Sequence, residues 1–123
     1  MPAIDPQPFL CGLDATLQVV GGKWKPLILY FLESRPMRFS ELKRSVRGVS
    51  DKVLAQQLRE LELHSVVART DHQEVPPRVG YSLTAFGESL VESMRPMCSW
   101  GERNAEKISE ALAQGGNGRR ALT

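Results

Sequence analysis

Three polar side chains at helical spacing, Lys52, Gln56 and Arg59, are the residues of this chain best suited to bind nucleic acid. At 3.6 residues per turn they share one side of a helix. The opposite side carries Leu54, Leu58 and Leu61. Lysine and arginine bind phosphates, whereas glutamine and arginine can also form paired hydrogen bonds with base edges in the DNA major groove. The pattern therefore indicates a recognition helix, and a solvated helix face is the alternative that the neighbouring elements must exclude.

The residues before this helix complete a known DNA-binding unit. Ser50 is a suitable N-cap, because its hydroxyl can accept a hydrogen bond from a backbone N–H of the first turn. A short helix capped by Ser40 is predicted over 41–46, and in the turn 47–49 Gly48 can adopt a positive φ. Two short helices joined by such a turn form a helix-turn-helix, so both serines are candidate DNA contacts.

After His64 the period of the apolar residues changes from 3.6 to 2, which predicts strands over 66–71 and 79–84. The proline-containing loop 72–78 between them should form the tip of a β-hairpin. A hairpin directly after a recognition helix defines a winged helix-turn-helix. Arg78 at the base of the loop could enter a minor groove, or could be an exposed loop charge.

Helices are also predicted on both sides of this unit. The first runs over 12–20, the second begins near Pro26, and the last runs over 85–113 with Thr84 as its cap. Pro96 should kink or break the last helix, because it removes an internal hydrogen bond. Lys23 and Lys25 stand at the start of the second helix, where they could hold a phosphate.

The first and last helices carry more apolar surface than so small a domain can bury, which predicts a homodimer. The residues expected at its interface are Leu13, Leu17, Met94, Met97, Trp100 and Ile108. We expect residues 1–10 to be an extended arm, 11–113 to be the DNA-binding and dimerisation domain, and 114–123 to be a disordered tail.

Composition limits the other classes of function. The net charge is only +2, but residues 21–80 hold eleven Lys/Arg against seven Asp/Glu, a local excess of +4 around the predicted recognition helix. No apolar run could span a bilayer and no signal peptide is evident, so a cytoplasmic protein without membrane contact is expected. His64 and His72 are too sparse for a metal site, and no nucleophile motif is present. We therefore expect no enzymatic activity, metal or cofactor.

Cys11 lies at the predicted start of the first helix, where the positive helix end would make its thiol more reactive and favour a redox or electrophile sensor. The alternative is an inert cysteine that packs as a small apolar residue. Cys98, on the apolar stripe of the last helix, belongs by default to the core or the dimer interface. An intersubunit disulfide between the two cysteines remains a hypothesis, because it requires Cα atoms within about 7 Å.

Five motifs, in order and at the right distances, resemble the HxlR family of bacterial transcription regulators. They are the segments 21–24, 38–42, 50–54, 58–61 and 75–84. The resemblance implies a mainly α protein with a small β-hairpin, a winged helix-turn-helix that dimerises through its N- and C-terminal helices. It also implies binding to double-stranded DNA at a near-palindromic operator, with repression expected.

In that family the position of Cys11 often holds a reactive cysteine, which implies an oxidant, quinone or aldehyde as effector. Here Gly12 replaces the proline that usually follows this cysteine, and His64-Ser65 replaces an acidic-glycine pair. Two alternatives stay open: a small-molecule-responsive regulator with inert cysteines, and a winged-helix protein-interaction module that does not bind DNA.

Overall fold

The computed structural model describes residues 8–71 and 79–119. The helices and strands are α1 (Gly12–Val20), α2 (Trp24–Ser34), β1 (Met37–Arg38), α3 (Phe39–Ser45), α4 (Asp51–Leu63), β2 (Val67–Asp71), β3 (Val79–Leu83), α5 (Ala85–Arg103) and α6 (Ala105–Arg119). They divide into two compact units, Met1–Val91 and Glu92–Thr123. The fold is therefore mainly helical with a small antiparallel sheet, as the sequence predicted.

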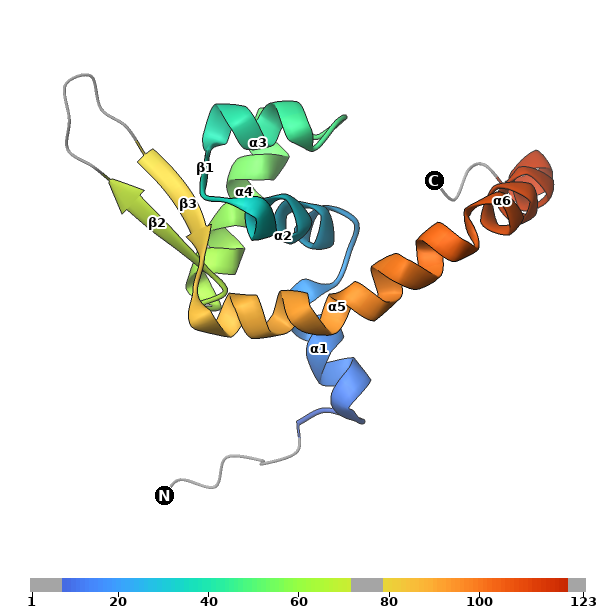
Figure 1. The fold of residues 1–123 in the computed structure, drawn as a ribbon, viewed down its shortest axis with the longest axis horizontal. Helices are drawn as coiled ribbons and strands as arrows, with labels where there is room; N and C mark the ends of the chain where they lie inside the picture. The colour runs from blue at the N-terminus through green and yellow to red at the C-terminus, as the bar shows by residue number, and fades with distance from the viewer. Residues whose placement is uncertain (1–7, 72–78, 120–123) are drawn as a thin grey trace. The chain divides into compact units, whose positions relative to one another are not determined.

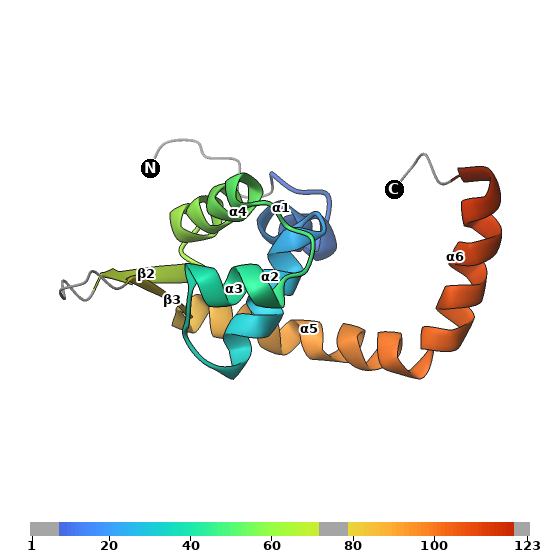
Figure 2. The same cartoon turned by 90° about the horizontal axis from the view of Figure 1, so that it is seen from above.

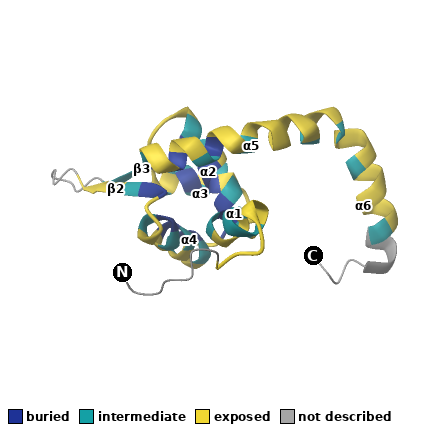
Figure 3. Ribbon diagram, turned by 90° about the horizontal axis from the view of Figure 1, so that it is seen from below, coloured by how far each residue is buried: buried dark blue, intermediate teal, exposed yellow. Residues whose placement is uncertain are grey.

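The core of the first unit lies between α2, α3, α4 and the sheet (Figures 1 and 3). Its fully buried side chains come from the three helices and from the residues directly after α3 and before β2: Ile28, Leu29, Leu42, Val46, Leu54, Leu58, Leu61 and Val66. The predicted apolar side of α4 is thus confirmed. Burial of these aliphatic side chains is the main favourable contribution to the stability of this unit.

The sheet has three strands in the order β1-β3-β2, and both pairs are antiparallel. β2 and β3 pair from Val67↔Leu83 to Asp71↔Val79, which confirms the predicted hairpin. Figure 2 shows these two strands extending away from the helices. β1 was not predicted, because two residues are too few to show a period. The loop 72–78 lies outside the described residues.

The chain turns where its residues favour a turn. Gly48, between α3 and α4, has a φ of +90°, as expected from the sequence. Ser65, between α4 and β2, has a φ of +64°, which is unusual for a residue with a side chain. Ser65 occupies the position where the resembled family usually has glycine, so the structure gives that preference a conformational reason.

Thr84 links the sheet to α5. Its hydroxyl accepts a hydrogen bond from the backbone N–H of Gly87 at 2.9 Å, and it donates to the carbonyl oxygen of Ser65 at 2.6 Å. The predicted cap of the last helix is therefore confirmed. Gly87 is buried, and a Cβ atom there would lie 2.1 Å from the carbonyl oxygen of Val66. Only glycine allows α5 to approach the chain so closely at this point.

Four predicted boundaries differ in the structure. α2 begins at Trp24, so Pro26 is its third residue, still within the first turn where a missing N–H is tolerated. α3 begins at Phe39, and Ser40 is not its cap. α5 continues through Pro96, and the helix is interrupted at Asn104 instead, where the side-chain amide donates to the carbonyl oxygen of Trp100 at 2.9 Å.

The fourth difference is at the C-terminal end. α6 continues to Arg119, beyond the expected end at Ala113. Residues 120–123 of the expected tail, and residues 1–7 of the expected N-terminal arm, lie outside the described residues. Within residues 8–71 and 79–119, no helix is both long enough and apolar enough to cross a lipid bilayer.

Candidate nucleic-acid interface

The exposed side of α4 carries the polar stripe that the sequence predicted. Lys52, Gln56 and Arg59 are all exposed, opposite the buried leucines. The helix starts as expected: the hydroxyl oxygen of Ser50 accepts a hydrogen bond from the backbone N–H of Val53 at 3.1 Å. The stripe is therefore displayed on a capped helix whose other side is fixed in the core.

The turn before α4 is held in place from both sides. Val46 and Val49 are buried, and Trp24 lies beneath the turn, with its ring 3.8 Å from the position of a Cβ atom at Gly48. Lys43 of α3 also lies 3.6 Å from the carboxylate of Asp51 at the start of α4. α3 and α4 are thus fixed relative to each other, as a helix-turn-helix requires.

Two further cations lie close to the stripe in sequence and were not predicted as DNA contacts. Arg44 in the last turn of α3 and Arg47 in the turn are both exposed. Their positions on the first helix and the turn of a helix-turn-helix are those that cross the DNA backbone. The signal available in the sequence was the local positive excess, which does not identify individual side chains.

Lys25 does not lie where the sequence analysis placed it. Its side chain is buried, and its ammonium group forms an ion pair with Oε1 of Glu60 on α4. The hydrogen bond and charge of Lys25 lower the pKa of the Glu60 carboxyl. The ammonium group is held inside the packing of α2 against α4, so the predicted phosphate contact by Lys25 is wrong.

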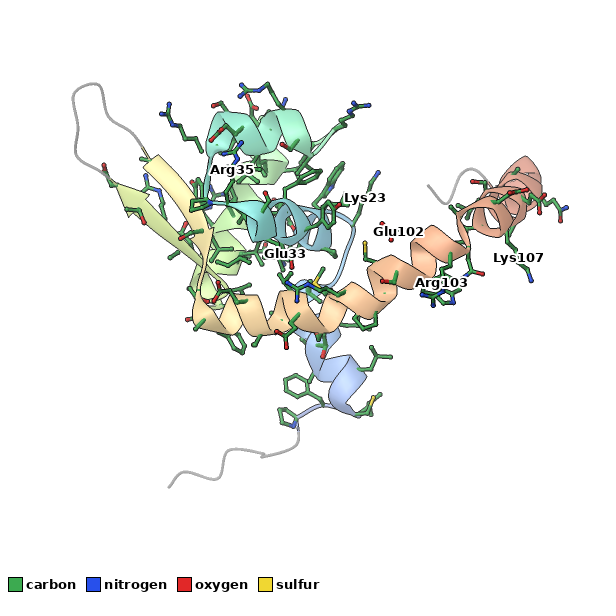
Figure 4. The ribbon with its side chains drawn as sticks, viewed as in Figure 1. Lys23, Glu33, Arg35, Glu102, Arg103 and Lys107 are labelled. Carbon is green, nitrogen blue, oxygen red and sulfur yellow. The ribbon has the colours of Figure 1, made fainter. Side chains whose placement is uncertain are left out.

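Lys23 keeps the exposure that a phosphate contact needs. It is the residue before α2, and its ammonium nitrogen lies 4.7 Å from the centre of the Trp24 ring. Figure 4 shows its side chain at the N-terminal end of α2. A cation stacked on an aromatic ring is partly ordered before any ligand binds.

The start of α3 is stabilised by Glu41. Its carboxylate accepts a hydrogen bond from the backbone N–H of Arg38 at 2.9 Å and another from Nη1 of Arg35 at 3.0 Å. These hydrogen bonds lower the pKa of the Glu41 carboxyl, the one from the Arg38 backbone most. Ser40 is exposed as the second residue of α3, where its hydroxyl is open to solvent; Arg78 lies outside the described residues.

Both cysteines are free thiols at the surface. Cys11 is the N-cap residue of α1, and the backbone N–H of Leu10 donates to the carboxylate of Asp14 at 2.9 Å. Cys98 on α5 is exposed, so within a single chain it is not a core residue. The cysteines belong to different units of the chain.

The predicted dimer residues are mostly uncovered in the single chain. Leu13 is 67% exposed and Trp100 is 56% exposed, and Leu17 and Met97 are exposed as well, whereas Met94 and Ile108 are half-buried. Two residues that the sequence analysis missed, Phe9 and Leu10, extend the apolar surface at α1. Large exposed apolar groups of this kind mark interaction surfaces.

Metal-ligand side chains form no candidate metal site in the part of the chain that the structure describes. Among residues 8–71 and 79–119, no group of three or more His, Cys, Asp or Glu side chains could hold a metal ion. A hollow on the surface of α4 is lined by Gln56, Arg59, Glu60, Glu62 and Leu63, so it lies beside the polar stripe.

Comparison with known proteins agrees with this geometry. The model of the HxlR-like helix-turn-helix family matches residues 19–109. This chain belongs to the HxlR family. It is 48% identical over 99 residues to YkvN of Bacillus subtilis, an uncharacterized HTH-type transcriptional regulator, and the match covers 80% of this chain and 84% of YkvN.

Solved structures of other regulators agree with this assignment. The redox regulator HypR in its reduced form matches with a TM-score of 0.77 and 38% identity, covering 81% of this chain and 99% of HypR. The reduced form of the transcriptional regulator YodB of B. subtilis matches with a TM-score of 0.69 and 31% identity, covering 80% and 98%. The chain is therefore a DNA-binding transcriptional regulator with a winged helix-turn-helix.

Proposed function

We propose that the protein acts as a homodimer that binds a near-palindromic operator through its two α4 helices. The observation that carries this proposal is the exposed stripe of Lys52, Gln56 and Arg59 on a helix whose opposite side is locked in the core. A rigid helix with phosphate- and base-binding side chains on its free side is the geometry that major-groove recognition requires.

Each α4 would enter one major groove. In this proposal Gln56 and Arg59 contact bases, and phosphates are contacted by other exposed residues: Lys23, Ser40, Ser50 and Lys52. A two-fold dimer would then place its half-sites about 34 Å apart, one turn of DNA. Phosphate contacts supply most of the affinity, so binding should weaken steeply with salt.

The exposed apolar residues of α1 and of the C-terminal helices support the dimer. In the single chain, side chains such as Leu13, Leu17, Met97 and Trp100 remain in contact with solvent. Covering them with the same surfaces of a second copy would remove this unfavourable exposure and produce the symmetry that a palindromic operator mirrors.

The DNA proposal is tested by titrating the protein into labelled duplexes from the region upstream of its own gene, in competition with random-sequence duplex at several salt concentrations. Specific binding should be at least about a thousandfold tighter than random binding. A footprint should show two half-sites one helical turn apart. Equal affinity for both duplexes would refute sequence-specific binding, and absence of binding to either duplex would favour a protein-interaction module instead.

We further propose that oxidation or electrophile modification of Cys11 controls DNA binding. The exposed thiol at the start of α1 supports this, next to the apolar surface of the proposed dimer. Two matched structures also support it: HypR is called a redox regulator, and one YodB structure is of diamide-treated protein. A change at this position could shift one subunit against the other and so change the distance between half-sites.

The test of the cysteine switch compares wild type with Cys11→Ser, with Cys98→Ser as the matched control. An oxidant or quinone should weaken operator binding by wild type and by Cys98→Ser, but not by Cys11→Ser. An unchanged response in Cys11→Ser would refute the switch. Retention of the response after both thiols are alkylated would favour a small-molecule effector with inert cysteines.

A further inference from the structure

Glu60 connects the buried ion pair to the DNA-facing stripe of α4. One carboxylate oxygen, Oε1, binds the ammonium group of Lys25, and the other, Oε2, accepts a hydrogen bond from Nε2 of Gln56 at 3.4 Å. Lys25 is buried on α2, Glu60 is partly exposed on α4, and Gln56 is exposed one turn earlier on α4. The three side chains therefore form a chain of polar contacts from the core to the surface.

This chain fixes the direction of the Gln56 amide. An ionised carboxylate has no proton to donate, so Gln56 can bind Glu60 only through its N–H. Glu60 is ionised at neutral pH, and the hydrogen bond and charge of Lys25 lower the pKa of its carboxyl further below the ordinary value of 4.5. The carbonyl oxygen of Gln56 and its second N–H are then free to contact a ligand.

A free carbonyl together with one free N–H matches a particular base. Adenine presents an N7 acceptor and an N6 donor in the major groove, whereas guanine presents two acceptors, N7 and O6. A glutamine that has already used one N–H can satisfy both groups of adenine but not both groups of guanine.

We infer that Glu60, held by Lys25, is a positioning residue that orients Gln56 to read adenine in each half-site. This inference rests on the proposed DNA-binding function. It adds which base Gln56 prefers, and it attributes that preference to the contact between Glu60 and Gln56. Lys25 also neutralises the charge of the Glu60 carboxylate, so Glu60 can orient Gln56 without repelling the DNA phosphates.

The test measures affinity for the operator and for all its single-base variants, using the full-length protein. At the base pair that Gln56 contacts, wild type should prefer one base over the others by about five- to hundredfold. Gln56→Ala should abolish this preference and so identify the base pair. In Glu60→Gln, the carbonyl of the introduced amide must accept from the ammonium group of Lys25, so its N–H points toward Gln56. The amide of Gln56 must then turn round, so that its carbonyl accepts this N–H and both of its own N–H groups are free. Preference at that base pair should then move from adenine toward guanine, and the other positions should keep their preferences.

Lys25→Met is the matched control, because it breaks the same ion pair and leaves the acceptor on Glu60. It should lower affinity for all operator variants by a similar factor and keep the preference for adenine. A base profile in Glu60→Gln equal to that of wild type, or weakened equally at every position, would overturn the inference. Failure of the underlying proposal looks different, since wild type itself would then show no discrimination between duplexes.

A second measurement does not depend on the folding of a variant. In the free wild-type protein, side-chain couplings from NMR should show Gln56 in a single rotamer, whereas Gln57 on the same helix provides a comparison. Averaging of Gln56 over several rotamers would also overturn the inference.

Discussion

Glu41 is the residue whose protonation should most directly affect the helix-turn-helix. Its carboxylate accepts hydrogen bonds from the backbone N–H of Arg38, the N-cap residue of α3, and from the side chain of Arg35. These contacts lower the pKa of the Glu41 carboxyl below its ordinary value of 4.5. They therefore stabilise the folded state fully at pH values above 4.5. This stabilisation is lost as the pH falls through the lower pKa of the folded state.

The prediction is that Glu41→Gln reduces the loss of stability on acidification. Wild type should become easier to unfold as the pH falls below about 4.5, and the variant should show a smaller decrease over the same range because it has no carboxylate to protonate at this position. Urea midpoints at a series of pH values provide the measurement. Equal pH dependence of the two proteins would contradict the assigned role of Glu41.

Ser65 offers a second test at the scale of one residue. Its φ of +64° is costly for any residue with a Cβ atom. Ser65→Gly should therefore stabilise the protein by about 0.5–1 kcal/mol, after the greater entropy of glycine in the unfolded chain is subtracted. The same change at Ser99, which lies exposed within α5, should destabilise it. A lower urea midpoint for Ser65→Gly would contradict this explanation.

The two lysines near Trp24 show what single residues in a sequence can and cannot reveal. Lys23 and Lys25 have the same chemistry and almost the same position, and both were predicted to bind phosphate. Lys23 is exposed, whereas Lys25 pairs with Glu60 of α4. The partner lies 35 positions away in the chain, so no local pattern could separate the two residues.

Among the elements, the start of α5 depends on close packing at a single glycine. A Cβ atom at Gly87 would lie 2.1 Å from the carbonyl oxygen of Val66, which cannot move without disturbing the hydrogen bond from Thr84 to the same oxygen. Gly87→Ala should therefore destabilise the protein, by roughly 2–4 kcal/mol in denaturant titrations.

Gly101 supplies the matched control on the same helix. Among the described residues, no atom lies within 4 Å of a Cβ atom built there, apart from the chain neighbours and the backbone of α5 itself. Gly101→Ala should leave stability unchanged or raise it by up to about 1 kcal/mol, because alanine favours the helix. If both variants had the same stability, the packing at Gly87 would not be the cause.

The elements with clear periodicity could be predicted from the sequence, and the others could not. α4 was predicted from Ser50 and three leucines, and the β2–β3 hairpin from alternation. β1 has two residues and depends on pairing with β3, a tertiary effect without a local signal. The break in the C-terminal helices falls at Asn104 although Pro96 is the stronger local breaker, because a proline costs a helix one hydrogen bond and does not forbid it.

At the scale of the whole molecule, the account predicts a dimer that depends on the uncovered apolar residues. Trp100→Ser should raise the dimer dissociation constant at least about tenfold, because aromatic side chains dominate such interfaces. Sedimentation of the free protein measures this directly, and operator affinity should fall with it. Leu63→Ser is the control, since Leu63 is also a large exposed apolar residue but lies on α4. An unchanged dissociation constant for Trp100→Ser would place the interface elsewhere.

The central claim is that the exposed side of α4 binds DNA, and its most direct test is the salt dependence of operator binding by wild type, Lys52→Ala and Arg59→Ala. Lys107→Ala on α6 removes the same charge outside the helix-turn-helix. When the logarithm of the binding constant is plotted against the logarithm of the salt concentration, loss of one phosphate contact should reduce the slope by about 0.9 per subunit. Loss of a base contact should instead weaken binding to the operator more than binding to random-sequence DNA.

We predict weaker operator binding for Lys52→Ala and Arg59→Ala, and wild-type binding for Lys107→Ala. Operator affinity and salt slope equal to wild type in both α4 variants would contradict the claim that α4 is the recognition helix.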